Sequence, residues 1–515
     1  MEFLKKIKLI QGGMGVYVSN WRLARAVSMA RPGVTAGAVS GTALDVVYAR
    51  FLQLGDPGGH IRRALAAFDA LFGVEIGRKI CDRYFIEGGK APTARFKNVP
   101  KQTVRLPNGV NSLLIPAHQT EPVALEMNED TVELIIATAF AEVWLAKEGH
   151  AGRVFINFLK KVELPLIFAM YGAMLAGVDG VIVGAGNPEG LPAICSHLAN
   201  HQPVNYDLQV LYRDSGETFY LPFDPHQVAD GRLAQKPLPR PAFLAIASLQ
   251  NLVEMLAHSP TESPNGFIIE HHTAGGHNAG PQGPLVKDSQ GQPVYGPEDE
   301  PDLEAIRKND LPFWLAGGYG SHEKLQQALS AGATGVQVGS VFALSEDSGM
   351  KPAHRNAILD AIKKGANDSD LVLTTLFSPT GYPFKVVQLE DTLADEAVYS
   401  RRKRICDIGL LQQIGLSKPA ADGSRRLFQR CQAAPIEEYV SKRGLLPNAD
   451  GKRCLCNGLL ASMGLSQVVS QDGELAEEPA IVTLGNHLDG VRRLSHQGQN
   501  PYWSHDVVED ILGPA

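Results

Sequence analysis

The feature that most constrains the fold is a series of short apolar segments alternating with segments of helical periodicity. These segments are rich in Val and Ile and are apolar throughout, rather than at every second position. Strands buried on both faces have this composition, and alternation with helices is typical of a parallel sheet. The predicted strands are residues 7–12, 33–41, 153–158, 180–186, 242–248, 266–271, 313–318 and 335–340.

Eight such units predict a (β/α)8 barrel, with a doubly wound sheet as the competing α/β architecture. Helices fit between the strands. The segment 19–30 repeats apolar residues at helical spacing and opens with Ser19 as the expected N-cap, and Ser321 is expected to cap another helix. A further helix is expected at about 130–147.

The 515 residues are too many for one simple barrel, which needs about 250. We therefore expect a barrel over residues 1–390, with insertions at about 72–150 and 203–240. The second insertion contains two β-rich runs around "DSGE", a hairpin signal. Residues 391–515 are expected to form a smaller appendix, mainly helical or irregular, that contains cysteines.

Composition excludes several classes of partner. The net charge of −7 disfavours a nucleic acid, and no apolar run approaches the roughly 20 residues that cross a bilayer. No export signal is visible, and six cysteines do not make a disulfide framework, so a reducing cytoplasm is expected. The expected partner is a small-molecule substrate, with a homo-oligomer or a synthase complex as the assemblies considered.

Glycines follow the last two predicted strands. Gly317 and Gly318 end one of them, and Gly339 and Ser340 end the next, about 21 residues later. In a barrel these turns are neighbours, at the place where a phosphate commonly binds. The chain has no GxxxxGK[ST], and no GxGxxG begins it in the manner of a dinucleotide-binding domain. The pattern therefore favours FMN over ATP or NAD as the tightly held ligand.

The segments "IQGGMGVYVSNWRLARAVS", "TAGGHNAG" and "WLAGGYGSHEKLQQALSAGATGVQVGSVF" resemble the nitronate monooxygenases, and also the related enoyl reductase subunits of polyunsaturated fatty acid synthases. The resemblance covers most of residues 7–345 and implies an FMN-binding barrel oxidoreductase. It implies Gln11, Gly12, Gly13, Met14 and Asn157 beside the isoalloxazine, and Gly275, Gly276, Gly317, Gly318, Gly339 and Ser340 around the phosphate.

The histidine of the "AGGH" motif is His277, which the resemblance implies lies near the reactive edge of the flavin. Imidazole titrates near neutrality, so it can accept a carbon-bound proton or hydrogen-bond an anionic nitronate. The alternative is a loop histidine that only satisfies backbone groups. His271 and His272 are adjacent on an extended segment, so at most one is expected to face the site, with His272 as a second candidate. Their spacing is not a metal signature.

Four cysteines lie in the appendix: Cys406, Cys431, Cys454 and Cys456. Four soft ligands suffice for zinc or for an iron-sulfur cluster, although this spacing lacks two CxxC pairs. The alternative is four reduced, partly buried thiols. Cys81 and Cys195 lie in apolar, helix-like settings and are expected in the core.

Three functions follow from these observations. The first is an FMN-dependent oxidoreductase that oxidises alkyl nitronates with dioxygen, His277 being the acid-base residue. The second is an enoyl reductase of lipid or polyketide synthesis that takes hydride from NAD(P)H. The third is a noncatalytic flavin-binding partner in a larger assembly. The insertions and the cysteine-bearing tail depart from the simpler nitronate monooxygenases.

Overall fold

The computed structural model describes residues 1–107, 113–117, 119, 121–471 and 474–514. A closed barrel of parallel strands, in the order β1-β15-β14-β13-β12-β8-β7-β2, forms its centre. Each predicted strand is one of these eight, so the barrel prediction is confirmed and the open sheet is excluded. The strands are β1 (Leu9–Gln11), β2 (Thr35–Ser40), β7 (Arg153–Leu159), β8 (Gly180–Gly184), β12 (Ala242–Ala247), β13 (Gly266–Glu270), β14 (Phe313–Ala316) and β15 (Gly335–Val338).

Side chains fill the inside of the barrel. Ile10, Phe155, Ile182 and Trp314 belong to one fully buried cluster from different strands. The 3-10 helix η1 (Glu2–Lys6) adds Leu4 to this cluster. The Trp314 indole N–H donates to the carbonyl oxygen of Ile7 at 2.8 Å. The interior is therefore packed and closed at its amino-terminal end, so a ligand is restricted to the carboxyl ends of the strands.

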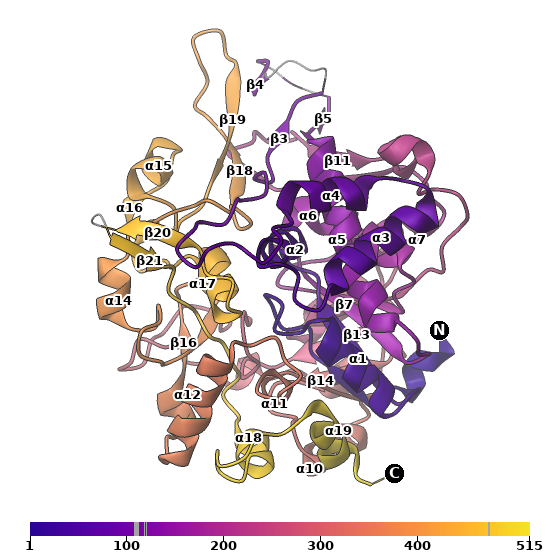
Figure 1. Ribbon diagram of the computed structural model, residues 1–515, viewed down its shortest axis with the longest axis vertical. Coiled ribbons are helices and arrows are strands. Elements are labelled where there is room, and N and C mark those ends of the chain that lie inside the picture. Colours follow the sequence, from indigo (N-terminus) through magenta and orange to yellow (C-terminus); the bar gives the residue numbers. More distant parts are fainter. Residues whose placement is uncertain (108–112, 118, 120, 472–473, 515) are drawn as a thin grey trace.

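Helices cover the outside of the barrel (Figure 1). They connect successive strands, as the alternating pattern predicted. Within the described residues, none of the helices is both long enough and apolar enough to cross a membrane. The crossover helices are α1 (Trp21–Ala30), α5 (Glu129–Lys147), α6 (Glu163–Leu175), α7 (Leu191–Ala199), α8 (Gln250–Ala257), α9 (Leu303–Arg307) and α10 (His322–Ser330).

One of the two predicted caps is correct. Ser321 caps α10, its hydroxyl accepting from the Lys324 N–H at 3.2 Å. Ser19 is not the cap of α1, because Asn20 takes that position and accepts from the N–H groups of Arg22 and Leu23. The Ser19 hydroxyl instead bonds the turn that follows β1.

Both predicted insertions carry elements of their own. The connection from β2 to β7 adds three helices before α5, together with four two-residue strands. In the second insertion β9 and β11 pair antiparallel, which confirms the hairpin. The elements are α2 (Leu44–Gln53), α3 (His60–Phe72), α4 (Ile76–Tyr84), β3 (Val104–Arg105), β4 (Leu114–Ile115), β5 (Val123–Ala124), β6 (Glu126–Met127), β9 (Val204–Asp207), β10 (Val210–Leu211) and β11 (Phe219–Phe223). Residues 108–112, 118 and 120 of the first insertion lie outside the described residues.

A short connecting region follows the barrel, and the tail comes after it. Figure 1 shows the tail, orange to yellow, along one side of the barrel. The connecting elements are α11 (Ser340–Ala343), α12 (Pro352–Lys363), α13 (Asp368–Leu371), β16 (Val372–Thr375) and β17 (Phe384–Val387). Those of the tail are α14 (Glu396–Arg401), β18 (Gln413–Leu416), β19 (Arg425–Arg430), α15 (Ile436–Ser441), α16 (Leu446–Ala449), α17 (Leu455–Ser462), β20 (Val468–Gln471), β21 (Glu474–Glu477), α18 (Asp489–Leu494) and α19 (Ser504–Leu512).

Strands of the tail join both insertions. β18 pairs with β10 and β19 pairs with β4, which gives a four-stranded sheet in the order β10-β18-β19-β4. At the other end, α19 packs against α1 and α10 on the outside of the barrel. The tail thus contains strands as well as the expected helices, and the boundary at residue 390 stays a prediction.

Candidate active site

The turn after β1 lies at the carboxyl end of the barrel and is fixed by backbone and hydroxyl bonds. The Gly12 N–H donates to the Val338 carbonyl at 2.8 Å. Ser19 Oγ donates to the Gly12 carbonyl at 2.7 Å and accepts from the Met14 N–H at 2.8 Å. These bonds hold the predicted Gly12–Met14 segment against the end of β15.

Gln11 is part of this framework. Its side chain is fully buried, the Nε2 group donates to Ser19 Oγ, and Oε1 accepts from the Ala38 N–H at 3.0 Å. Both polar groups of the amide are therefore hydrogen-bonded, one within the turn after β1 and one to the backbone of β2. Of the residues expected beside the flavin ring, Gln11 can contribute its backbone there but not its side chain.

Asn157 and Gly13 meet across the mouth. Asn157, on β7, donates from Nδ2 to the Gly13 carbonyl at 3.2 Å. A Cβ at position 13 would lie 2.1 Å from the Asn157 Cβ. Rotating the Asn157 side chain would not relieve this contact, because its Cβ is fixed to the backbone. Glycine is required here because the two backbones approach so closely. Met14 lies nearby, with its sulfur 3.5 Å from where a Cβ of Gly339 would stand.

The two last turns are neighbours, as the spacing predicted. β14 and β15 pair in parallel, so Gly317 and Gly318 lie beside Gly339 and Ser340. Gly317 and Gly318 have φ values of 97° and 83°, in the left-handed region that favours glycine. Ser340 starts α11, and its hydroxyl accepts from the Gly485 N–H at 2.7 Å. The N–H group that donates to the Ser340 hydroxyl therefore belongs to the tail.

The loop after β13 also contacts the tail. The Gly276 N–H donates to Thr483 Oγ1 at 2.9 Å, and the Asn486 N–H donates to the Thr273 carbonyl at 3.1 Å. A Cβ on Gly275 would lie 2.8 Å from the Gly485 nitrogen. We call residues 483–487 the tail strap. It lies directly on the turns that were expected to hold a phosphate.

The tail strap was missed by sequence reasoning. A Cβ on Gly318 would lie 2.7 Å from the His487 ring, so the strap borders the turn after β14 as well. The only local signal is the "TLGNH" segment, polar and glycine-containing within an appendix of low periodicity. Because 145 residues separate Ser340 from Gly485, nothing in the local pattern could join them.

The connecting region contacts His277 through a hydrogen bond and an aromatic ring. Its Nε2 atom is 2.8 Å from the hydroxyl of Ser378, and its ring packs edge-on against Phe384, with 4.8 Å between centroids. Ser378 is itself fully buried and hydrogen-bonded to the Thr380 hydroxyl. Burial lowers the pKa of His277 to about 4, so the imidazole is neutral at neutral pH.

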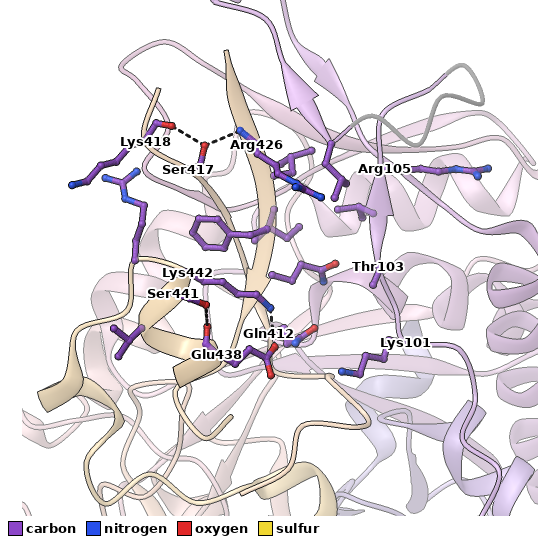
Figure 2. Close-up of a pocket in the computed structure, with 18 of the residues that line it drawn as sticks. Lys101, Thr103, Arg105, Gln412, Ser417, Lys418, Arg426, Glu438, Ser441 and Lys442 are labelled. Atoms are coloured by element: carbon purple, nitrogen blue, oxygen red, sulfur yellow. Dashed lines mark hydrogen bonds and ion pairs between the residues drawn. The ribbon is translucent and has the colours of Figure 1, made fainter. Parts of the chain in front are cut away.

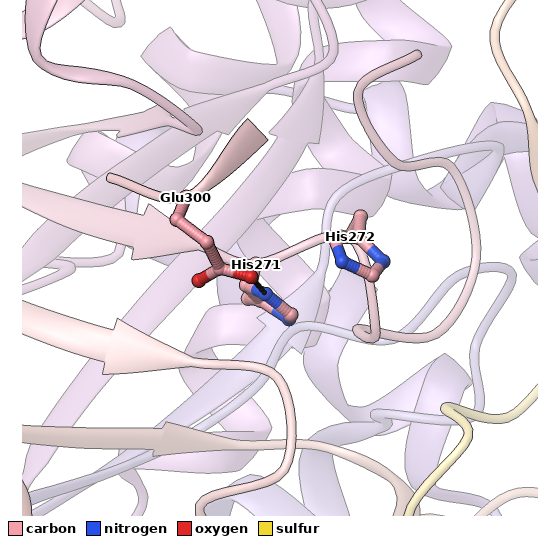
Figure 3. Close-up of side chains that lie close together, drawn as sticks. All are labelled: His271, His272 and Glu300. Carbon is pink, nitrogen blue, oxygen red and sulfur yellow. Dashed lines mark hydrogen bonds and ion pairs between the residues drawn. The ribbon is translucent and has the colours of Figure 1, made fainter. Parts of the chain in front are cut away.

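The expectation that His271 and His272 point in opposite directions is wrong. The strand ends at Glu270, so both histidines lie in a turn and not on extended backbone. Their ring centroids are 4.0 Å apart, and His271 Nε2 is 2.9 Å from a carboxylate oxygen of Glu300 (Figure 3). Donor atoms of the three residues all lie within 4.8 Å of one another. The prediction that these histidines bind no metal remains untested.

His272 has a second neighbour. Its ring stacks on Tyr295, with 3.9 Å between centroids and 5° between the planes. Burial, with His271 and Lys385 adding repulsion, lowers the pKa of His272 to about 4. Tyr295 also donates from its hydroxyl to Asn278 Oδ1 at 2.9 Å, so the stacked pair connects His272 to the residue after His277.

Buried charge lies behind this loop. Lys385 on β17 donates to the His272 carbonyl at 2.6 Å and to Thr374 Oγ1 at 2.9 Å. Burial lowers the pKa of Lys385 to about 8, and burial raises the pKa of Glu270 to about 8. The opposite charges partly offset these shifts, since Glu270 raises the pKa of Lys385 and Lys385 lowers the pKa of Glu270.

The four late cysteines come together in space. Cys431 and Cys454 form a small buried cluster with Ala433 and Ala434, against which Cys406 and Cys456 pack. None of them is in a disulfide bond. Of the other two, Cys195 is fully buried, as expected, whereas Cys81 is only part-buried and packs against the core.

A basic groove lies away from the barrel mouth (Figure 2). It has a volume of 1180 Å³ and lies between the first insertion and strands β18 and β19 of the tail. Its charged lining is mostly positive, and Glu438 is paired with Lys442 at 2.8 Å. None of the predicted site residues lines this groove, so it is separate from the candidate active site. Its cationic residues are Lys101, Arg105, Lys418, Arg426, Lys442 and Arg443.

Comparisons with known proteins support the resemblance seen in the sequence. Residues 242–391 match the nitronate monooxygenase family, and this segment contains His277 and both final turns. A probable nitronate monooxygenase from Bacillus subtilis is 43% identical over 68 residues, which are 13% of this chain. That match spans only 18% of the length of the curated relative. The predicted resemblance to this family is confirmed over these residues.

Two solved structures are similar along almost the whole chain. FabK from Thermotoga maritima is 13% identical, with 99% of this chain and 93% of that chain covered and a TM-score of 0.43. Nitroalkane oxidase from Streptomyces ansochromogenes is also 13% identical, with 99% and 97% covered and a TM-score of 0.43.

Proposed function

We propose that this protein is an FMN-dependent oxidoreductase that oxidises alkyl nitronates with dioxygen. The observation that most supports the proposal is the meeting of the two final turns with the His277 loop at one end of the barrel. All three lie within the segment that matches the nitronate monooxygenase family. In a barrel, this end is where ligands bind and react.

The residues present fit FMN. Gly317, Gly318, Gly339 and Ser340 would hold its phosphate, together with Gly275 and Gly276. Buried acceptors without a partner remain nearby: Gln337 Oε1 on β15, two residues before Gly339, and Asn486 Oδ1 in the tail strap. Hydroxyl groups of a ribityl chain are donors that would satisfy them. Gly12, Gly13, Met14 and Asn157 would lie beside the ring, which supplies a two-electron acceptor when bound.

His277 would act on the proton of the substrate. A neutral imidazole can accept a proton from the carbon next to a nitro group, or hydrogen-bond the resulting anion. When Ser378 Oγ donates to Thr380, it accepts from His277 Nε2–H, and Nδ1 is then the basic nitrogen. The low pKa keeps His277 unprotonated at neutral pH and makes it a weak base, so its contribution rests on positioning as well as on basicity.

The test is anaerobic reduction of the purified protein. The absorption spectrum should show flavin bands, and ethyl or propyl nitronate should bleach them while NADH and NADPH do not. Rapid bleaching by NAD(P)H would replace the proposal with the enoyl reductase. Turnover that is unchanged in His277→Asn would favour a noncatalytic flavin-binding partner. A cytoplasmic location and a homo-oligomer or synthase partner stay predictions.

A further inference from the structure

Four cysteines from three separate segments converge beside the barrel. Cys406 lies in the loop after α14, Cys431 follows β19, and Cys454 and Cys456 begin α17. They form a cluster distinct from the two larger apolar cores. The chain has two further cysteines, and neither is in this cluster. Convergence of four thiols from positions 406 to 456 indicates a shared ligand more readily than it indicates four independent packing choices.

Buried arginines next to the cluster have N–H groups without acceptors. Arg50 is 1% exposed, and its Nε and Nη2 atoms have no hydrogen-bond partner. Its Nη1 group donates to the Leu465 carbonyl, and the carboxylates of Asp407 and Glu478 act on its charge without forming an ion pair among the described residues. Arg453, adjacent to Cys454, also has two buried nitrogens without a partner.

Carboxylates lie near these arginines as well. Arg402 pairs with Glu478. Arg453 pairs with Glu396, which is largely exposed. A buried N–H group without an acceptor is costly, and a thiolate is a stronger acceptor than a neutral thiol. Thiolates at the cysteines would place such acceptors beside the unpaired N–H groups of Arg50 and Arg453.

Hydrogen-bond donors also point at the sulfurs. Asn457 Nδ2 is 3.7 Å from Cys454 Sγ, and Gln412 Nε2 is 3.6 Å from Cys406 Sγ. Cys454 is the N-cap of the eight-residue helix α17, where the helix dipole stabilises a thiolate.

We propose that Cys406, Cys431, Cys454 and Cys456 bind an iron-sulfur cluster, with one cysteine on each of four irons. Binding converts the four thiols to thiolates and releases their four protons, and two ferrous ions, two ferric ions and four sulfide ions are taken up without a change of oxidation state. The thiolate-ligated cluster supplies acceptors beside the unpaired arginine N–H groups.

The spacing of the sulfurs favours a cluster over one zinc ion. A tetrahedral Zn²⁺ with four thiolates brings the sulfurs to about 3.8 Å from one another. Within the described part of the chain, three donors all within 4.8 Å of one another occur at His271, His272 and Glu300 alone, so no three of the cysteine sulfurs are that close. A cluster spreads its ligands because each one binds a different metal atom.

The cysteine loop is connected to the candidate active site. Lys452 Nζ donates to the carbonyls of Leu376 and Ser378, at 2.8 and 3.0 Å, and the Arg453 N–H donates to the Phe377 carbonyl at 3.0 Å. Ser378 holds His277. The chain just before the strap is also held in place, since the N–H of Ile481, two residues before the strap, donates to the Gly458 carbonyl at 2.8 Å. By fixing the segment around residue 452, the cluster would stabilise the loop of Ser378, which contacts His277.

The direct test is metal and sulfide analysis of the full-length protein purified without oxygen. The expected result is about four irons and four acid-labile sulfides per chain, with an electron paramagnetic resonance signal after reduction by dithionite. Protein isolated without metal should regain this content when incubated anaerobically with equal amounts of ferrous and ferric iron and with sulfide. About one zinc per chain without sulfide, or no uptake of iron by the folded protein, would overturn the proposal.

Single variants locate the site. Cys431→Ser and Cys454→Ser should lose at least half of the iron, and Cys406→Ser, at a part-exposed position, provides a variant that is easier to fold. Cys81→Ser is the matched control and should keep the full iron content. Circular dichroism checks that each variant is folded. Iron and sulfide are measured independently of flavin and turnover, so this proposal can fail while the proposed function stands, and the reverse.

Discussion

The barrel turns and the tail strap lie at the same end of the barrel. The sequence predicts the turns but gives almost no indication of the strap. Gly317, Gly318, Gly339 and Ser340 follow consecutive strands, so their meeting is a consequence of barrel closure. The strap, residues 483–487, reaches the same place from the end of the chain and donates to Ser340 and accepts from Gly276. The comparison teaches that barrel closure brings the turns together, whereas a segment distant in the sequence reaches them through hydrogen bonds that the local pattern does not reveal.

The largest expected effect concerns the barrel side of this comparison. His277→Asn should lower the turnover of the neutral nitroalkane, whose carbon-bound proton must be removed, by about 10²–10⁴-fold, the contribution of a positioned acid-base residue. Flavin content should not change, because His277 is not among the turns proposed to hold the phosphate. Stopped-flow reduction and flavin absorbance measure both quantities. His258→Asn, at the exposed C-cap position of α8, is the control, and equal activity of the two variants would contradict the assignment.

The next effect tests the close approach at the mouth. Gly13→Ala would place a Cβ 2.1 Å from the Asn157 Cβ, so the β1 turn must move. Overpacking of this kind costs about 1–3 kcal/mol, which corresponds to a loss of FMN affinity of up to about 10²-fold. Equilibrium titration of deflavinated protein with FMN measures the effect. Gly280→Ala, whose added Cβ would meet nothing nearer than 3.8 Å, should bind FMN normally.

A smaller effect tests the tail side. Gly485→Ala would place a Cβ 2.9 Å from the Thr273 carbonyl oxygen and 3.2 Å from Ser340 Oγ. Displacing the strap should cost about 1 kcal/mol, or about a fivefold loss of FMN affinity in the same titration. The barrel itself should stay intact by circular dichroism. Affinity equal to that of the unaltered protein would show that the strap only covers the mouth and adds nothing to the ligand site.

The smallest expected effect is a pH dependence of stability. The pKa of His277 is about 4 in the folded protein and about 6.5 when exposed, so the unfolded chain binds more protons between these values. The free energy of unfolding should therefore fall as the pH falls from 6.5 towards 4. Urea titrations across this range should show a shallower slope for His277→Asn. His272 has the same direction of shift and retains part of the slope.

The local sequence pattern predicts much of the fold. Each barrel strand was recognisable because strands buried on both faces are continuously apolar, and their order follows from the alternation with helices. The cap of α1 was misplaced by one residue because Ser19 and Asn20 are both good N-caps, and only the turn after β1 shows which of them is occupied elsewhere. The opposed directions expected for His271 and His272 were wrong because β13 ends at Glu270.

The sequence by itself determined the barrel, its closing turns and the position of His277, because these depend on periodicity and on the residues that end each strand. Only the tertiary structure decided that β18 and β19 join the two insertions, that the strap reaches Ser340, and that four cysteines meet beside buried arginines. Local backbone preferences act over a few residues. Contacts between segments more than a hundred residues apart are selected by burial and by the need to pair buried polar groups, and one stretch of sequence does not contain that information.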